Sequence, residues 1–314
     1  MQVFTHSLPT PHQNLAYEQW YFNHFEEETL RLWINPDSVI VGKHQNALAE
    51  CNFQYCLENN IPVLRRISGG GTVYHDLGNI NFSFFRHVEK SKMIDYDRSL
   101  VLIKEALINL GFPVTMNKRH DLYLGESKVS GNAQHIRSKR ALHHGTILYS
   151  TDSEVLRKSI KRIHGKFEDK GVASVRSKII NLKPTKNLGT ANQFMNQLLN
   201  TLVAKGMTEI AAPNPPDQIL DSIIQSSLAL DDWNFGYSPK YSFDNETQNW
   251  RIHLEVDRGG EITEASITSL INNQKFPTEN LIGQKHFYRE IKVWVEQHTA
   301  LSTADQKQIL EAMF

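Results

Sequence analysis

The chain has 314 residues and a mass of 36.1 kDa, enough for about two domains of roughly 150 residues each. Its hydrophobic content of 40% and charged content of 22% are ordinary for a folded protein and exclude a mostly disordered chain. The 34 basic and 34 acidic residues give zero formal charge at pH 7. No overall positive field can therefore hold a nucleic acid or an anionic membrane, and we expect neither as a partner.

The N-terminal half predicts alternating helices and strands. Apolar residues recur at helical spacing over residues 11–25, and residues 32–34 and 39–41 read as short strands. Strand-like runs follow at 61–64 and 80–85. Asp97 or Ser99 can open a helix over 100–110, and Gly111 can end it because glycine tolerates the left-handed conformation.

The C-terminal half continues this mixture of helices and strands. Residues 146–150 read as a strand, Ser153 can cap a helix that carries Leu156, Ile160 and Ile163, and Thr190 with Gln193 forms a capping-box pattern. The polar stretch 244–249 predicts a boundary between domains at 1–243 and 249–314. In the second domain we expect a half-buried strand at 250–256, a hairpin turn at 258–260 and a final helix capped by Thr303 and Gln306.

Cysteines and chain ends indicate a cytoplasmic protein. The N-terminal residues lack the basic and apolar segments of a secretion signal, and no run of about 18 apolar residues occurs. Cys51 and Cys56, the two cysteines, are spaced neither as a redox pair nor as zinc ligands. We expect both to be reduced and buried.

The most informative segment is RRISGGGTVYHDLGN at residues 65–79. Three consecutive glycines allow the backbone to approach a ligand and to present several N–H groups to an anion. Arg65 and Arg66 add permanent charge, and Ser68 and Thr72 add hydroxyl groups. A P-loop motif is absent, and a dinucleotide-binding motif would need glycine at Tyr74. The pattern predicts a site for a phosphate or a carboxylate that is neither of these two folds.

A second segment, residues 126–150, places Lys128 before the small residues Ser130 and Gly131. A lysine at such a turn can bridge a carboxylate and a phosphate and cancel their repulsion; an exposed lysine at the end of a strand is the alternative. His143 and His144 read as a hydrogen-bonded strand edge, and without a third ligand we expect no metal there. Residues 161–182 lack regular periodicity and form either a lid over a charged ligand or an ordinary surface loop.

Four segments together, RRISGGGTVYHDLGN, KVSGNAQ, HHGTILYSTD and KGVASVRSKIINL, resemble the lipoate-protein ligase A family. The likeness also covers residues 14–18, 40–50 and 231–243. It implies an α+β fold: a mixed-sheet catalytic domain of the biotin/lipoate protein ligase type and a small C-terminal α+β accessory domain.

The resemblance implies a reaction in two steps. Lipoate or octanoate attacks the α-phosphorus of ATP to give an acyl-AMP and pyrophosphate, and the acyl group then passes to a lysine of a lipoyl domain. The implied acceptors are the apo lipoyl domains of 2-oxoacid dehydrogenase E2 subunits and the glycine cleavage H protein, and the implied enzyme is a monomer.

The resemblance also assigns residues to this reaction. The loop 170–177 would close over the adenylate, and Mg²⁺ would accompany ATP with Asp121 as a ligand. Lys128 would be catalytic and would touch both ATP and lipoate. The ATP contacts would be Arg66, Gly71, Thr72, Val73 and Tyr74, and the lipoate contacts would be Ser68, Gly69, Gly70 and His144.

One departure and three alternatives accompany this assignment. Where the family commonly has G-R-N-D-L, this chain has K-R-H-D-L at residues 118–122, so a ligand contact from that asparagine is in doubt. A lipoyltransferase that uses preformed lipoyl-AMP is the nearest alternative. A cysteine-dependent octanoyl transferase is disfavoured because residues 128–150 contain no cysteine. A biotin ligase lacks support because its GRGRxGR-type loop is absent, and retention of Lys128 argues against a silent binder of lipoyl domains.

Overall fold

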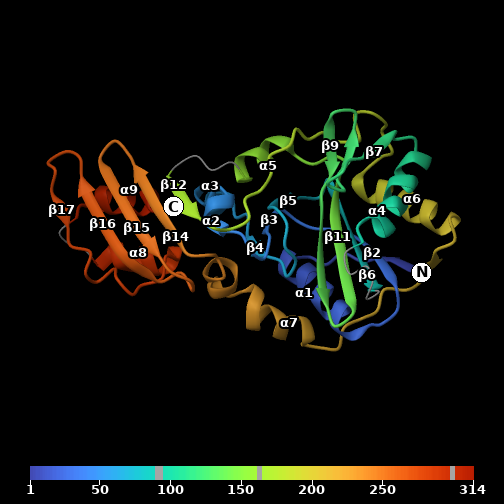
Figure 1. The fold of residues 1–314 in the computed structure, drawn as a ribbon, viewed down its shortest axis with the longest axis horizontal. Helices are drawn as coiled ribbons and strands as arrows, with labels where there is room; N and C mark the ends of the chain where they lie inside the picture. The colour runs from blue at the N-terminus through green and yellow to red at the C-terminus, as the bar shows by residue number, and fades with distance from the viewer. Residues whose placement is uncertain (89–94, 161–164, 298–300) are drawn as a thin grey trace.

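The computed structural model describes residues 1–88, 95–160, 165–297 and 301–314, and Figure 1 shows a larger unit joined to a smaller C-terminal one. The elements, in chain order, are β1 (Gln2–Thr5), α1 (Pro11–His24), β2 (Thr29–Ile34), β3 (Ser38–Val41), α2 (Ala47–Glu50), α3 (Phe53–Glu58), β4 (Val63–Arg65), β5 (Val73–His75), β6 (Asn79–His87), α4 (Asp97–Asn109), β7 (Val114–Met116), β8 (Leu122–Leu124), β9 (Ser127–Ser130), β10 (Asn132–Arg137), β11 (Arg140–Leu148), α5 (Ser153–Ile160), β12 (Lys166–Asp169), α6 (Ala191–Ala204), β13 (Thr208–Glu209), α7 (Ile219–Ile223), two π-helical turns, η1 (Ile224–Leu228) and η2 (Asp232–Gly236), β14 (Tyr241–Glu246), β15 (Trp250–Val256), β16 (Ile262–Ser269), β17 (Lys275–Phe276), α8 (Tyr288–Gln297) and α9 (Thr303–Ala312).

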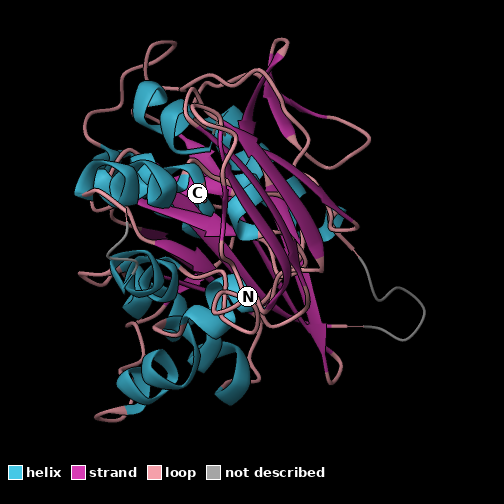
Figure 2. Ribbon diagram, turned by 90° about the vertical axis from the view of Figure 1, so that its left-hand side faces the viewer, coloured by secondary structure: helices cyan, strands magenta, loops and turns pink. Residues whose placement is uncertain are grey.

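Four sheets organise the described residues. The largest has six strands in the order β10-β11-β6-β2-β1-β13, with parallel pairing of β1 to β2 and to β13 and antiparallel pairing elsewhere. Two three-stranded sheets, β4-β3-β5 and β7-β8-β9, flank it, and β12-β14-β15-β16-β17 forms the C-terminal sheet. In Figure 2 the strands run through the middle of the molecule, and helices lie beside and behind them. The predicted α+β fold with mixed sheets is confirmed.

Alternation along the central strands divides the large sheet into two faces. Phe82 and Phe84 of β6 are fully buried in the core that α4 and α6 also line. Asn81, Ser83 and Phe85 point to the opposite face because successive strand side chains alternate. That second face meets α1 and carries the polar groups described below.

The residues that cap the helices can be compared with the predicted ones. Thr190 and Gln193 form the expected capping box at the start of α6. At α9 the predicted cap was wrong by one residue, because the cap is Ser302, whose hydroxyl accepts from the Asp305 amide (3.1 Å). The caps predicted for α4 were also wrong: Tyr96 occupies the cap position without a side-chain hydrogen bond. Gly111 follows α4 with a φ of 91°, as expected for a helix end.

The C-terminal sheet begins before the polar stretch predicted to separate two domains. Residues 244–249 form the end of β14 and the turn into β15, so this stretch is part of the sheet. β12 comes from the middle of the chain and pairs with β14. The division at 243/249 stays a prediction, and the sheet favours a boundary before Tyr241.

Several smaller expectations have direct outcomes. Cys51 and Cys56 are free and buried, as predicted. The strand at 250–256 and its hairpin turn at 258–260 are confirmed by the antiparallel pairing of β15 with β16. The helix predicted from Ser153 ends at Ile160, and Ile163 lies outside the described residues. None of the described helices combines the length and apolar character needed to span a bilayer.

Candidate functional site

A cavity of about 210 Å³ lies where three of the sequence motifs meet the first helix. The loop between β4 and β5 supplies the glycines, β9 supplies Lys128, and the strands β10 and β11 supply the opposite wall. Its lining comprises Leu15, Trp33, Ile40, Arg66, Gly70, Gly71, Thr72, Val73, His75, Asn81, Arg119, Asp121, Lys128, Gly131, Asn132, Ala133, His144, Gly145, Thr146, Ser174 and Val175.

Lys128 reaches this cavity from β9 with most of its hydrogen-bonding capacity free. Its backbone is fixed because its N–H donates to the Lys178 carbonyl (2.8 Å) and its carbonyl accepts from the Ile180 amide (3.1 Å). Its Nζ lies 2.8 Å from Asp121 Oδ1. A lysine ammonium has three N–H donors, so two remain for a ligand. A Cβ at Gly131 would lie 3.0 Å from both Cε and Nζ, which explains why glycine stands beside this lysine.

The glycine-rich loop is held close to its neighbours along its whole length. Gly70 has a φ of 82°, a conformation that favours glycine. A Cβ at Gly71 would lie 3.0 Å from Ser174 Oγ. Gly42, which the sequence analysis missed, has no room at all: a Cβ there would lie 2.0 Å from the Gly70 carbonyl oxygen. The feature of the sequence that could have pointed to Gly42 was its position directly after the strand β3.

Arg66 holds the backbone of this loop. Its Nε donates to Ser68 Oγ (2.9 Å), Nη1 donates to the Ile40 carbonyl (3.0 Å), and Nη2 donates to the carbonyls of Gly69 (2.6 Å) and Gly71 (2.7 Å). Burial lowers the pKa of its guanidinium to about 10, so it stays charged at neutral pH. Four of its five N–H groups are thus in use, and one on Nη1 is left for a ligand.

Arg65 points away from the cavity. Its guanidinium donates to the backbone carbonyls of Trp233 (2.9 Å) and Asn234 (2.8 Å) at η2 and to that of Gln45 (2.7 Å). The charge that the sequence analysis assigned to an anion site at this position therefore joins the loop to the segment before β14.

Strand alternation separates the predicted nucleotide contacts. Val73 and His75 line the cavity, whereas Tyr74 lies between them on β5 and is buried in the core with Leu148 and Leu156. Successive side chains of a strand point to opposite faces. The side chain of Tyr74 therefore does not face the cavity, contrary to the role predicted for it.

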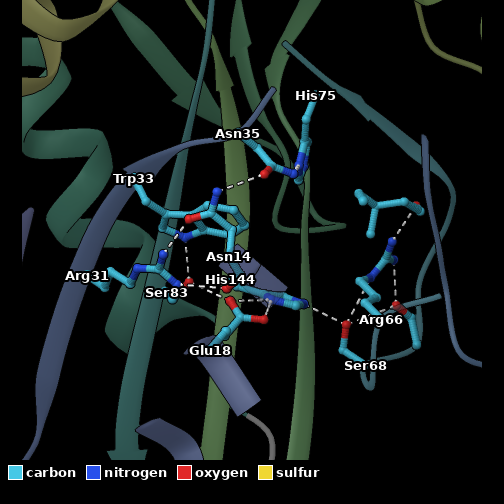
Figure 3. Close-up of polar contacts among 12 residues, drawn as sticks. Asn14, Glu18, Arg31, Trp33, Asn35, Arg66, Ser68, His75, Ser83 and His144 are labelled. Carbon is cyan, nitrogen blue, oxygen red and sulfur yellow. Dashed lines mark hydrogen bonds and ion pairs between the residues drawn. The ribbon is translucent and has the colours of Figure 1, made fainter. Parts of the chain in front are cut away.

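A buried chain of hydrogen bonds runs beneath the loop, as Figure 3 shows. His144 Nδ1 lies 3.0 Å from both carboxylate oxygens of Glu18, and its Nε2 lies 2.6 Å from Ser68 Oγ. Ser83 Oγ donates to Glu18 (2.6 Å). Burial acts to raise the pKa of the Glu18 carboxyl, but the His144 charge and the hydrogen bonds from His144 and Ser83 bring it below its ordinary value. Glu18 is thus a buried carboxylate.

This network corrects the prediction for the two histidines and places the predicted acyl contacts. β11 lies between β10 and β6, so His143 and His144 occupy a central strand and not an edge. His144 lines the cavity as predicted for a substrate contact, and Gly70 does too. Ser68 is fully buried, and neither Ser68 nor Gly69 is part of the lining. They act on the cavity through His144 and Arg66.

A second buried branch was not predicted from the sequence. Arg31 is fully buried, and its Nη2 donates to Asn14 Oδ1 (2.8 Å); Asn14 Nδ2 donates to Asn35 Oδ1 (3.0 Å), and Asn35 Nδ2 lies 3.1 Å from His75 Nδ1. Burial and then the Arg66 charge lower the pKa of His75 to about 3, so it is neutral. The available signal was Asn14, a polar side chain among the apolar residues of the first predicted helix.

The loop predicted as a lid lies against the glycine-rich loop. Ser174 Oγ accepts from the Thr72 amide (2.8 Å) and from Gln45 Nε2 (3.0 Å), and the Ser174 amide donates to Glu50 Oε1 (3.1 Å). Thr72 Oγ1 in turn donates to Gln45 Oε1 (2.9 Å). Ser174 and Val175 line the cavity, so residues 170–177 form part of its wall.

The K-R-H-D-L segment places Arg119 and Asp121 on the cavity but turns His120 away. His120 has a φ of 61°, its ring stacks on Tyr96 (5.1 Å between ring centres) and its Nε2 lies 3.5 Å from Asp97 Oδ1. Arg119, which the sequence analysis did not single out, lines the cavity. Asp121 is the one carboxylate in the lining, and no cluster of three metal-binding side chains occurs within the described ranges.

Comparison with known proteins agrees with the geometry. Residues 10–203 match the family model of the lipoyl protein ligase A/B catalytic domain. The chain is 32% identical to lipoate-protein ligase LplJ of Bacillus subtilis over 264 residues, covering 81% of this chain and 80% of the relative. It is 37% identical to the human mitochondrial lipoyl amidotransferase LIPT1 over 260 residues, covering 78% and 68%.

Solved structures share the fold. A lipoate-protein ligase A structure bound with ATP superposes with a TM-score of 0.64 at 23% identity, covering 75% of this chain and 98% of that one. The P. falciparum LipL1 structure in complex with lipoate superposes with a TM-score of 0.62 at 23% identity and covers 98% of both chains. The family model spans well over half of the chain, and the protein therefore belongs to the lipoyl protein ligase A/B family.

Proposed function

We propose that this protein is an ATP-dependent lipoate-protein ligase. It would activate lipoate or octanoate as the acyl-AMP and transfer the acyl group to a lysine of an apo lipoyl domain. The observation that carries the proposal is that Lys128 Nζ, with two unused donors, and the glycine-rich loop line one cavity. The reaction is adenylation followed by amide formation, and a cytoplasmic location is part of the proposal.

The first step joins two anions, so its main requirement is cancellation of charge. A carboxylate oxygen attacks the α-phosphorus, the bond to the pyrophosphate oxygen breaks, and pyrophosphate leaves with its electron pair. Lys128 is placed to bind the carboxylate and an α-phosphate oxygen together. The free N–H of Arg66 Nη1 and the N–H group of Gly71 are suited to the remaining phosphate oxygens.

The acyl chain has an apolar end of the cavity available. Leu15, Trp33 and Ile40 line it, and burial there contributes about 0.8 kcal/mol per methylene group. This apolar lining suits the hydrocarbon chains of both lipoate and octanoate. In the second step the acceptor amine attacks the acyl carbonyl, loses a proton and displaces AMP.

Mg²⁺ fits this cavity as a companion of ATP. Magnesium is commonly held by substrate phosphates, water and one or two carboxylates, and Asp121 is the carboxylate available in the lining. When bound, Mg²⁺ would neutralise the leaving pyrophosphate.

The test is exchange of labelled pyrophosphate into ATP that depends on lipoate. We expect exchange with the purified chain and a mass increase on an apo lipoyl domain when ATP, Mg²⁺ and lipoate are supplied together. Acceptors to compare are E2 lipoyl domains and the glycine cleavage H protein.

A second candidate follows from the human relative, whose name describes an amidotransferase. It would be a lipoyltransferase that uses supplied lipoyl-AMP without forming it. Transfer from synthetic lipoyl-AMP without lipoate-dependent exchange would favour this candidate and overturn the ligase assignment.

A further inference from the structure

A second cavity, of about 480 Å³, lies at the junction of the catalytic part and the C-terminal sheet. Its lining includes His44, Lys170, Val172, Tyr237 and Arg258. Lys170 follows β12, and Arg258 lies in the turn between β15 and β16. Binding sites occur preferentially at such junctions, and this volume lies within their usual range.

The lining of this cavity is basic. It contains Lys170, Arg258 and His44 but no carboxylate, and within the described ranges neither Lys170 nor Arg258 takes part in an ion pair. The acids that precede Lys170 and Arg258 in the chain accept from backbone amides: Asp169 from that of Gly171 (2.6 Å) and Asp257 from that of Arg258 (2.7 Å). The cavity is therefore complementary to carboxylates.

An aromatic surface accompanies this charge. Tyr237 is 45% exposed, and Lys43 Nζ lies 5.7 Å from the centre of its ring. The Arg65 guanidinium lies 5.9 Å from the same ring centre, and tyrosine is enriched in the cores of protein–protein interfaces.

The loop 170–177 forms a wall of two cavities. We call the present one the junction cavity and the one around Lys128 the reaction cavity. Lys170 and Val172 line the junction cavity, whereas Ser174 and Val175 line the reaction cavity. Gln45 ties the two parts together, because its Nε2 donates to the Val172 carbonyl (2.9 Å) and to Ser174 Oγ (3.0 Å). A protein bound at the junction would therefore lie next to the loop that covers the adenylate.

We propose that the junction cavity, defined by Lys170, Arg258, His44 and Tyr237, docks an acidic surface loop of the acceptor protein beside its target lysine. This inference rests on the proposed function and adds the surface that recognises the acceptor. Arg258 supplies long-range attraction from the C-terminal sheet, and Lys170 places the bound loop beside the reaction cavity.

The test is Arg258→Glu, because Arg258 lies outside the reaction cavity. Transfer is measured from supplied lipoyl-AMP to an apo lipoyl domain, so the result does not depend on adenylation. We expect KM for the acceptor to rise about tenfold at low salt, because reversal turns attraction into repulsion, and the difference to shrink at high salt. Capture of the acyl group by hydroxylamine, which needs no docking, should be unchanged.

Matched variants isolate the site. Arg258→Lys should keep KM within about twofold, and Lys275→Glu on the far strand β17 should leave KM unchanged. An acceptor whose acidic residues next to the target lysine are changed to lysine should bind Arg258→Glu better than the wild type does. An unchanged KM, an equal effect of Lys275→Glu, or a parallel loss of hydroxylamine capture would each overturn the docking proposal. Missing pyrophosphate exchange would overturn only the ligase assignment.

Discussion

The reaction cavity has a buried floor, which includes Arg66 and His144, and a more exposed mouth, which includes Lys128 and Arg119. The polar side chains of the two regions differ in how many of their hydrogen bonds are already made within the protein. On the floor, Arg66 and His144 have nearly all their donors and acceptors occupied by Ser68, Glu18 and backbone carbonyls. At the mouth, Lys128 makes one ion pair and keeps two donors free. Side chains whose hydrogen bonds are all made within the protein stabilise the fold, whereas side chains with free donors can bind a ligand. Substitutions on the floor should therefore reduce the free energy of unfolding, and substitutions at the mouth should reduce catalysis.

The largest effect should follow Lys128→Ala. Loss of a cation that stabilises developing charge typically costs about 10²–10³ in rate, so we expect lipoate-dependent pyrophosphate exchange to fall by at least about 100-fold. The melting temperature should change little, because the Lys128 side chain is partly exposed. Lys178→Ala, on an exposed neighbour, is the control. Full exchange activity in Lys128→Ala would exclude the bridging role.

Arg66→Met tests the floor. Three carbonyls and one hydroxyl each lose one donor, and a buried acceptor that is left unpaired costs about 1–3 kcal/mol before relaxation. We expect the free energy of unfolding in urea to fall by about 3 kcal/mol. Arg119→Met removes an arginine from the mouth and should change it by less than about 0.5 kcal/mol. Equal stabilities of the two variants would contradict the division between floor and mouth.

Gly131→Ala should displace Lys128 without removing it. The added Cβ would lie 3.0 Å from Lys128 Nζ, so the ammonium must move. We expect about a tenfold fall in kcat for adenylation, since small misplacements of a catalytic group are costly. Ser130→Ala is the control, because the buried Ser130 hydroxyl has no hydrogen-bond partner. A variant with unchanged kcat would show that the lysine position is not critical.

The smallest effect concerns His143, which lies on the face of β11 opposite the site. Both of its ring nitrogens are buried without a partner, and burial followed by the His144 charge lowers its pKa to about 3. The unfolded chain, with a histidine pKa of about 6.5, binds the proton more readily. Above pH 6.5 His143 is neutral in both states, so its protonation does not reduce the free energy of unfolding. As pH falls from 6.5 toward 3, the unfolded chain binds a proton that folded His143 does not, and the free energy of unfolding decreases.

His143→Leu removes this group. We expect the variant to be more stable by about 1 kcal/mol at pH 7 and to lose less stability between pH 6.5 and 4. Part of the slope should remain, because burial also lowers the pKa of His75 to about 3 and that of His286 to about 4. Unfolding in urea at several pH values measures both effects, and His87→Leu, at an exposed histidine, is the control.

Features that depend on neighbouring residues could be predicted from the sequence. The glycine-rich loop, the turn after Lys128 and the capping box at Thr190 each lie within a few residues, where local chemistry decides the conformation. The side of β5 on which Tyr74 lies could not be assigned, because a three-residue strand has too little alternation to show which face is buried.

Contacts between residues that are far apart in the chain could not be predicted from the sequence. Glu18 and His144 are 126 positions apart and meet because β11 belongs to the sheet whose one face α1 covers. Gly42 was missed because the carbonyl of Gly70 that excludes its side chain belongs to another loop. Neither pairing has a local pattern, since each depends on how the sheets assemble.

The strand β12 connects the catalytic part of the molecule to the C-terminal sheet. This strand leaves the catalytic part, pairs with β14 in the C-terminal sheet and leads directly into the loop that carries Ser174. The C-terminal sheet and the part of the reaction-cavity wall that carries Ser174 are therefore attached to one stretch of chain. We therefore expect that a displacement of that sheet by a bound partner would also shift Ser174 at the wall of the reaction cavity.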